Sequence, residues 1–203
     1  MLIFYNYSFH SQKKMAKFIL GRKLGMTTVY DKDKGALNVT LIECEPNTVS
    51  LVRSSEKDGY NAAQIEIPKT KNKTHKKEFR LSENKSGIKK GSKITVEIFK
   101  EGDKVKISGL SKAKGFQGVV KRHGFSGSPR THGHKHDLRA PGSIGSAFPE
   151  HVVKGKKMAG RMGGKRVSVK NVKVVYINKD KNLIGVKGAV PGVAGRIVEI
   201  SAN

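Results

Sequence analysis

The feature that most restricts the fold of this chain is the segment of residues 111–170, which has neither a helical nor an alternating apolar period. It holds 14 of the 41 Lys and Arg residues, 11 of the 23 glycines and 5 of the 7 histidines, but only 2 acidic residues. Such a composition cannot bury enough apolar surface to form its own core. The core must therefore come from the flanking regions. We predict that the segment is a two-armed extension, with a reach of at most roughly 90 Å, that folds against a partner.

The two flanking regions contain short runs of Val, Ile, Thr and Tyr, which are typical of β-strands. The strands predicted before the extension cover residues 17–20, 26–31, 36–43, 47–54, 62–68, 93–99 and 103–108, and those after it cover residues 167–177, 183–188 and 196–200. This spacing favours a small barrel or sandwich. The simplest architecture is a barrel closed by strands from both ends of the chain.

The predicted fold class is therefore mainly β, a β-barrel with a small α+β insertion and a long basic, glycine-rich extension. The body comprises residues 15–110 and 167–203, with the insertion near residues 68–92, and the extension comprises residues 111–166. The insertion is polar and basic, and a short helix is predicted within it at residues 76–83.

The charge of the whole chain indicates a polyanionic partner. The formal net charge is +25 on 203 residues, with a sequence pI near 10.2. A folded domain does not require this excess, and self-repulsion would destabilise it, so nucleic acid is the natural partner. No run approaches the roughly 20 apolar residues that a membrane span needs.

Two local features bear on cellular context. The single cysteine, Cys44, lies in an apolar run and is predicted to be a small buried residue that forms no disulfide. Residues 1–14 precede a second methionine, Met15, and we expect them to be a disordered leader or a misassigned start.

The densest group of candidate RNA-binding residues lies in residues 112–125. Lysine and arginine neutralise phosphates, and the neighbouring glycines let the backbone approach RNA closely. Phe116 and Phe125 either stack on bases or pack beneath the loop, and packing is the favoured role. The candidate RNA-binding residues here are Lys112, Lys114, Lys121, Arg122 and His123.

Three alternating histidines precede an aspartate, Asp137, in the middle of the extension. If the backbone is extended there, the three imidazoles share one face and a metal site is conceivable, but the neighbouring cations disfavour a metal ion. Contacts to RNA phosphates, sugars or bases explain the composition better. A His-dependent nuclease is a weaker alternative, since no pocket or fixed nucleophile is evident. The RNA-binding candidates of this part are Arg130, His132, His134, Lys135, His136 and Arg139.

A nearly uncharged patch separates these residues from a second basic run. Its small residues suit a narrow site, so we predict that it forms the tip of the extension. The patch comprises residues 139–145. The second run lacks the phosphate-binding loop pattern that ends in Gly-Lys-Ser/Thr. Its candidate RNA-binding residues are Lys154, Lys156, Lys157, Arg161, Lys165 and Arg166.

Together these stretches resemble one family, the bacterial form of the universal large-subunit ribosomal protein number three. The resemblance covers residue 15 to about residue 200. MAKFILGRKLGMT resembles the amino terminus of the family, and the later signatures, in the family's order, are KGFQGVVKRHGF, THG at residues 131–133, RAPGSIG, KGKKMAGRMG and LIGVKGAVPG. The leader at residues 1–14 is not part of the family pattern.

The resemblance implies a β-barrel body of the translation-protein type and a structural rather than enzymatic role in the cytoplasmic ribosome. It also implies that the extension enters large-subunit ribosomal RNA and that the protein acts early in subunit assembly. The part implied to lie nearest the peptidyl-transferase centre is the tip, which consists of Pro141, Gly142, Ser143, Ile144, Gly145, Ser146, Ala147 and Phe148. The implied partners are this RNA and neighbouring large-subunit ribosomal proteins. No cofactor, metal, membrane or small-molecule substrate is expected.

Overall fold

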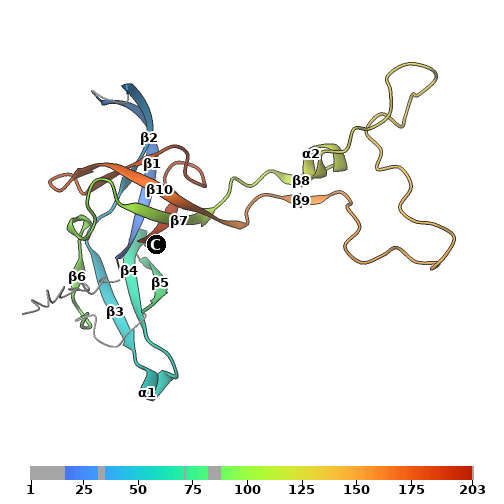
Figure 1. The fold of residues 1–203 in the computed structure, drawn as a ribbon. Helices are drawn as coiled ribbons and strands as arrows, with labels where there is room; N and C mark the ends of the chain where they lie inside the picture. The colour runs from blue at the N-terminus through green and yellow to red at the C-terminus, as the bar shows by residue number, and fades with distance from the viewer. Residues whose placement is uncertain (1–16, 32–34, 71, 82–87, 203) are drawn as a thin grey trace, which may run out of the picture.

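The strand-rich flanks form a closed antiparallel barrel in the computed structural model, which describes residues 17–31, 35–70, 72–81 and 88–202. The strand order around the barrel is β1-β12-β7-β10-β11-β2 (Figure 1). The bounds of these strands are β1 Phe18–Asp31, β2 Gly35–Glu43, β7 Lys104–Leu110, β10 Arg166–Asn178, β11 Leu183–Lys187 and β12 Ile197–Ala202. The mainly β prediction is confirmed, and β12 at the chain end does pair with β1 near its beginning.

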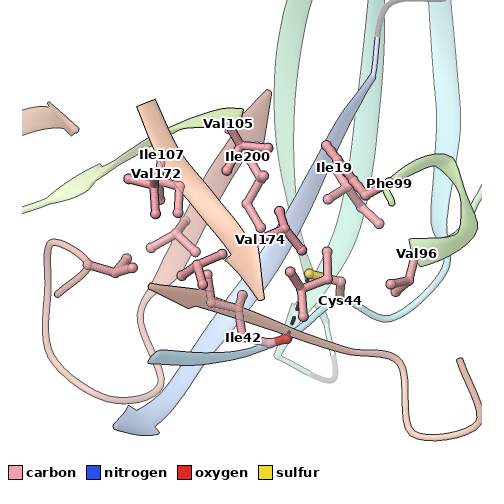
Figure 2. Packing of buried hydrophobic residues seen from close by; sticks show 14 residues of the cluster. Ile19, Ile42, Cys44, Val96, Phe99, Val105, Ile107, Val172, Val174 and Ile200 are labelled. Atoms are coloured by element: carbon pink, nitrogen blue, oxygen red, sulfur yellow. Dashed lines mark hydrogen bonds between the residues drawn. The ribbon is translucent and has the colours of Figure 1, made fainter. Parts of the chain in front are cut away.

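Alternating Val and Ile side chains from these strands fill the barrel, because successive residues of a strand point to opposite faces. Val105 and Ile107 of β7 meet Ile200 of β12 and Val174 of β10 in this cluster (Figure 2). Cys44 belongs to the same cluster and is fully buried, which confirms its predicted placement. Burial raises the pKa of its thiol far above the usual range, so the thiolate is not populated at neutral pH.

Strand β1 contributes to two cores at once. Ile19 points into the barrel, whereas Phe18 and Leu20 point into a second apolar cluster on the outside of it. The two runs that the sequence predicted as separate strands, residues 17–20 and 26–31, are thus parts of one strand with an irregular register between Lys23 and Gly25. The first half of β1 pairs with β12 and the second half with β2.

The second apolar cluster lies under a separate four-stranded sheet with the order β5-β4-β3-β6. Its strands are β3 Asn47–Arg53, β4 Ala62–Thr70, β5 Lys73–Arg80 and β6 Lys93–Ile94, and a single helical turn, α1 Ser55–Asp58, joins β3 to β4. This unit is larger than the insertion predicted near residues 68–92. The strands predicted at residues 47–54 and 62–68 are not barrel strands.

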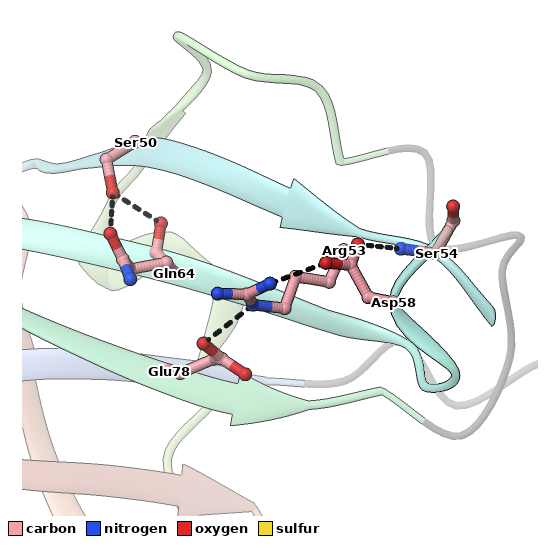
Figure 3. A network of polar contacts seen from close by, with 6 residues as sticks. All are labelled: Ser50, Arg53, Ser54, Asp58, Gln64 and Glu78. Atoms are coloured by element: carbon pink, nitrogen blue, oxygen red, sulfur yellow. Dashed lines mark hydrogen bonds and ion pairs between the residues drawn. The ribbon is translucent and has the colours of Figure 1, made fainter. Parts of the chain in front are cut away.

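Ion pairs hold the end of this sheet together. The Arg53 guanidinium donates to Glu78 at 3.1 Å and to Asp58 at 2.5 Å, and so links β3, β5 and α1 (Figure 3). Arg53 and Arg80 also lie over the Tyr60 ring, with their guanidinium carbons 5.7 and 5.5 Å from its centroid. These contacts tie the ends of β3 and β5 to the turn that joins β3 to β4.

The helix predicted at residues 76–83 is wrong for the residues that the structure describes, because residues 73–80 form strand β5. Phe79 stacks on Phe18 of the barrel with ring centroids 4.7 Å apart, and β5 pairs with β4 along its length. These contacts come from residues distant in sequence, and they override the local helical preference of a Lys- and Glu-containing run.

The strand predicted at residues 93–99 is also only partly correct. After β6, the chain forms a 3₁₀ turn, η1 Val96–Ile98. In a 3₁₀ helix, side chains three residues apart lie on the same side. Val96 and Phe99 therefore both enter the barrel core, where they are 1% and 3% exposed.

No helix in the described part of the chain is long and apolar enough to cross a membrane. The leader predicted at residues 1–14 lies outside the described residues.

Candidate nucleic-acid interface

The basic segment leaves the barrel as two adjacent arms between β7 and β10 (Figure 1). At its root, the Ser111 N–H donates to the Lys165 carbonyl at 2.9 Å, and the Lys114 N–H donates to the Met162 carbonyl at 3.0 Å. The short strands β8 Gly115–Gln117 and β9 Gly160–Met162 then pair antiparallel. Backbone hydrogen bonds therefore hold the two arms together at the root of the extension.

Glycines allow the two arms to approach closely. Gly163 has a φ of +72°, and a Cβ there would lie 2.0 Å from the Lys112 carbonyl oxygen. A Cβ on Gly160 would lie 2.8 Å from the Arg122 guanidinium. A side chain at Gly163 would clash with the backbone of the other arm, so this glycine is a structural requirement of the root, whereas a side chain at Gly160 would displace the Arg122 guanidinium.

A helical turn, α2 Val119–His123, follows β8 and is anchored by the buried side chain of Val119. Gly124 ends it in the left-handed conformation. Arg122 donates from its guanidinium to the Met158 carbonyl on the other arm, and the His123 ring lies 3.0 Å from the same oxygen. These two predicted RNA-binding residues are half-buried and hold the arms together, a role that the sequence did not reveal.

The remaining predicted RNA-binding residues are exposed to solvent. Arg166 forms an ion pair with Glu199 of the barrel, the only ion pair that involves residues 111–166 among those described. The extension is therefore a surface of cations with almost no internal compensation. These exposed residues are Lys112, Lys114, Lys121, Arg130, His132, His134, Lys135, His136, Arg139, Lys154, Lys156, Lys157, Arg161, Lys165 and Arg166.

The histidine cluster does not have the extended backbone that a shared metal face requires. His132 and Gly133 both have positive φ values, +57° and +81°, so the chain turns between the first and second histidine. Among the described residues, no group of three His, Cys, Asp or Glu side chains could hold a metal ion.

Part of the cluster instead lines a shallow hollow beside the tip. Gly127 closes this region, because a Cβ there would lie 2.1 Å from the Leu138 carbonyl oxygen, and the Ser128 N–H donates to the same oxygen at 3.2 Å. His134 and Asp137 line the hollow together with Pro141 and Gly142. The fold thus brings the histidine segment against the start of the neutral tip.

All eight predicted tip residues are exposed, including the large side chains Ile144 and Phe148, which are 43% and 80% exposed. Phe116 is 76% exposed, so the prediction that it packs beneath its loop is wrong. Phe125 is half-buried, with its ring 6.1 Å from that of His123. Exposed aromatic rings beside cations can stack on nucleic-acid bases.

Comparison with known proteins agrees with the family resemblance seen in the sequence. The model of the ribosomal protein L3 family matches residues 74–183, which include the whole extension. Large ribosomal subunit protein uL3 of Chlorobium limicola is 44% identical over 201 residues, covering 90% of this chain and 96% of that protein. Large ribosomal subunit protein uL3 of Chloroherpeton thalassium is also 44% identical, covering 90% of this chain and 97% of that protein.

The chain belongs to the ribosomal protein L3 family.

This membership confirms the family resemblance seen in the sequence, and with it the predictions of a structural ribosomal role and of no enzymatic activity. In this L3-family chain, the family match continues from β5 through both arms into β11. The family model therefore matches the whole extension together with parts of both flanking regions.

Proposed function

We propose that this chain binds large-subunit ribosomal RNA through the extension of residues 111–166, within the cytoplasmic ribosome. The observation that carries the proposal is the set of exposed cations in the extension, of which only Arg166 has a carboxylate partner among the described residues. Cations without internal partners are available to neutralise phosphates and to release their counterions.

Contacts at the root of the extension keep its two arms together, as this role requires. The β8–β9 pair and the contacts of Arg122 and His123 with Met158 hold two like-charged arms side by side. Neutralisation by RNA removes the repulsion between the arms, so binding and ordering of the extension favour each other. Backbone and Lys/Arg contacts of this kind position the protein on RNA without reading base sequence.

The tip of residues 141–148 has a different role in this proposal. It carries no Lys or Arg and so can enter a site already crowded by RNA without adding charge to it. Following the family, we place it nearest the peptidyl-transferase centre, where it supports the RNA and takes no part in bond formation. Early action in subunit assembly and contacts with neighbouring large-subunit proteins complete the proposal, with no cofactor, membrane or small-molecule substrate.

Replacing Lys156, Lys157 and Arg161 together by Gln tests the role of the arms. Each phosphate contact contributes about 0.7 to 0.9 to the slope of log affinity against log salt. We expect binding of the full chain to large-subunit RNA to lose about 2 to 3 of that slope. The matched control replaces three exposed lysines outside the extension, Lys57, Lys104 and Lys181. An equal loss of slope in the control would refute a special role for the arms.

A bulky residue at the tip tests the division of labour between tip and arms. A Cβ on Gly145 meets no atom within 4 Å, so Gly145→Leu leaves the extension itself undisturbed. We expect this variant to enter large subunits normally but to alter peptidyl transfer or the response to antibiotics that bind there. An incorporation defect as large as that of the triple charge variant would argue against this division.

A further inference from the structure

A basic groove lies beside the root of the extension, between the barrel and the β4–β5 hairpin of the second sheet. Its volume is about 570 Å³. It is lined by residues from β1, β4, β5 and β12 and by the ends of β7 and β10, where the extension begins. These segments are far apart in the sequence, so no local motif revealed the groove.

The lining is strongly cationic. Five Lys and Arg residues and one histidine face one acid, Glu199. Both carboxylate oxygens of Glu199 are already engaged, one by Lys77 at 3.3 Å and the other by Arg166. In the described part of the chain, no carboxylate forms an ion pair with Lys69 or Arg196. The basic residues are Arg22, Lys69, His75, Lys77, Arg166 and Arg196.

The positive charges of the groove exceed its negative charge. Burial, together with the nearby charges of Lys69 and Lys77, lowers the pKa of His75, and Glu199 opposes this only in part. Arg22 is held at the rim by a hydrogen bond from its guanidinium to the Pro68 carbonyl. The basic side chains are therefore already in place to bind an anion in the groove.

We propose that this groove binds the sugar-phosphate backbone of an RNA strand, as a second RNA contact beside the root of the extension. The inference rests on the proposed function, because it takes the partner to be ribosomal RNA. Arg166 and Leu110 belong both to the groove and to the root of the arms, so a strand running along the arms reaches the groove without a break. An acidic protein segment is the competing occupant.

The lining also suits a nucleotide chain better than a free anion. Leu110 and Val193 are 42% and 43% exposed and offer apolar contact to ribose or base faces. A Cβ on Gly195 meets no atom within 4 Å, which leaves open space beside Arg196. Phosphates spaced along a strand can engage cations at both sides of the groove at once, which a single small anion cannot do.

The test places a cleavage probe in the groove of the full chain. The cysteine of Thr70→Cys carries tethered iron-EDTA, which generates hydroxyl radicals that cut nearby RNA. Thr70 lines the groove, is exposed, and lies next to Lys69. Ser143→Cys at the tip serves as the reference position. The parent chain gives the background, because its Cys44 is fully buried and escapes labelling.

We expect cuts in large-subunit RNA from both probe positions. Adding Lys69→Gln and Arg196→Gln should weaken the cuts from position 70, leave those from position 143, and reduce the salt slope of binding by about 1 to 2. The charge-matched pair Lys57→Gln and Lys181→Gln, neither of which lines the groove, should change neither.

Three results would overturn the inference. Cuts from position 143 without cuts from position 70 would exclude RNA from the groove and leave the proposed function intact. Absence of cuts from both positions would refute the proposed function as well. Cleavage of a neighbouring protein instead of RNA by the position-70 probe in assembled subunits would identify an acidic protein segment as the occupant.

Discussion

Gly21 lies where β1 crosses the barrel core, and Gly21→Ala tests how tightly this crossing is packed. A Cβ at this position would lie 2.5 Å from the Cys44 sulfur, 2.6 Å from Cγ2 of Ile42 and 2.8 Å from the Glu43 carbonyl oxygen. Carbon atoms pack best at about 3.5 to 4.0 Å, so the added methyl group is about 1 Å too close to the Ile42 carbon, and it also crowds the Cys44 sulfur and the Glu43 oxygen. Gly21 does not have a positive φ, so the cost is one of packing alone.

Overpacking of a close-packed core costs about 1 to 3 kcal/mol. For a domain of this size each kcal/mol lowers the melting temperature by about 2 to 4 °C, so Gly21→Ala should lower it by about 2 to 12 °C. Gly25→Ala on the same strand is the matched control, because a Cβ there meets no atom within 4 Å. Its effect should stay within about 0.5 kcal/mol.

Thermal unfolding followed by circular dichroism measures both variants. A second change, Cys44→Ala, removes the nearest atom and should recover part of the loss, so the two substitutions should not be additive. Equal melting temperatures for the Gly21 and Gly25 variants would refute the packing described for β1.

Two further predictions concern the root of the extension and the barrel rim. Gly163→Ala should loosen the arms more than Gly155→Ala, because both residues have positive φ but only Gly163 faces a backbone oxygen, that of Lys112; faster amide exchange at Lys114 measures this, and equal exchange in the two variants would contradict it. The hydrogen bond from Lys17 at 2.6 Å lowers the pKa of Asp103, with the Lys100 N–H adding to it. A carboxylate with a lowered pKa stabilises the fold above its unfolded pKa of about 3.9, and this stabilisation disappears as the pH falls through the lowered pKa. Lys17→Gln should therefore reduce stability to urea at pH 7, and the difference should vanish at the acid end of a pH series; a difference independent of pH would contradict this.

The barrel was predictable because its strands show an alternating pattern of apolar residues within their own sequence. Polar or small residues separate Val105 from Ile107 and Val198 from Ile200. This alternation does not depend on which strands pair with each other. The lack of a core in the extension was predictable for the opposite reason. Its high charge and glycine content, without apolar periodicity, excluded a core, and most of its side chains are indeed exposed.

The failures occurred where distant residues decide the outcome. Strand β5 depends on its pairing with β4 and on the stacking of Phe79 on Phe18, which local propensity does not contain. The 3₁₀ turn Val96–Ile98 lets both Val96 and Phe99 pack into the barrel core, and this packing depends on residues distant in sequence. The basic groove is the clearest example, since its basic residues come from separate strands and from the loop before β12, and they become neighbours only when the barrel and the second sheet meet.

Sedimentation of a cell lysate at low magnesium and moderate salt tests the central claim most directly. With the chain traced across the gradient, we expect it to migrate with the large ribosomal subunit and to be absent from the fractions of free protein. Migration as a free protein, or together with DNA, would contradict the proposal that its uncompensated cations serve to bind large-subunit RNA.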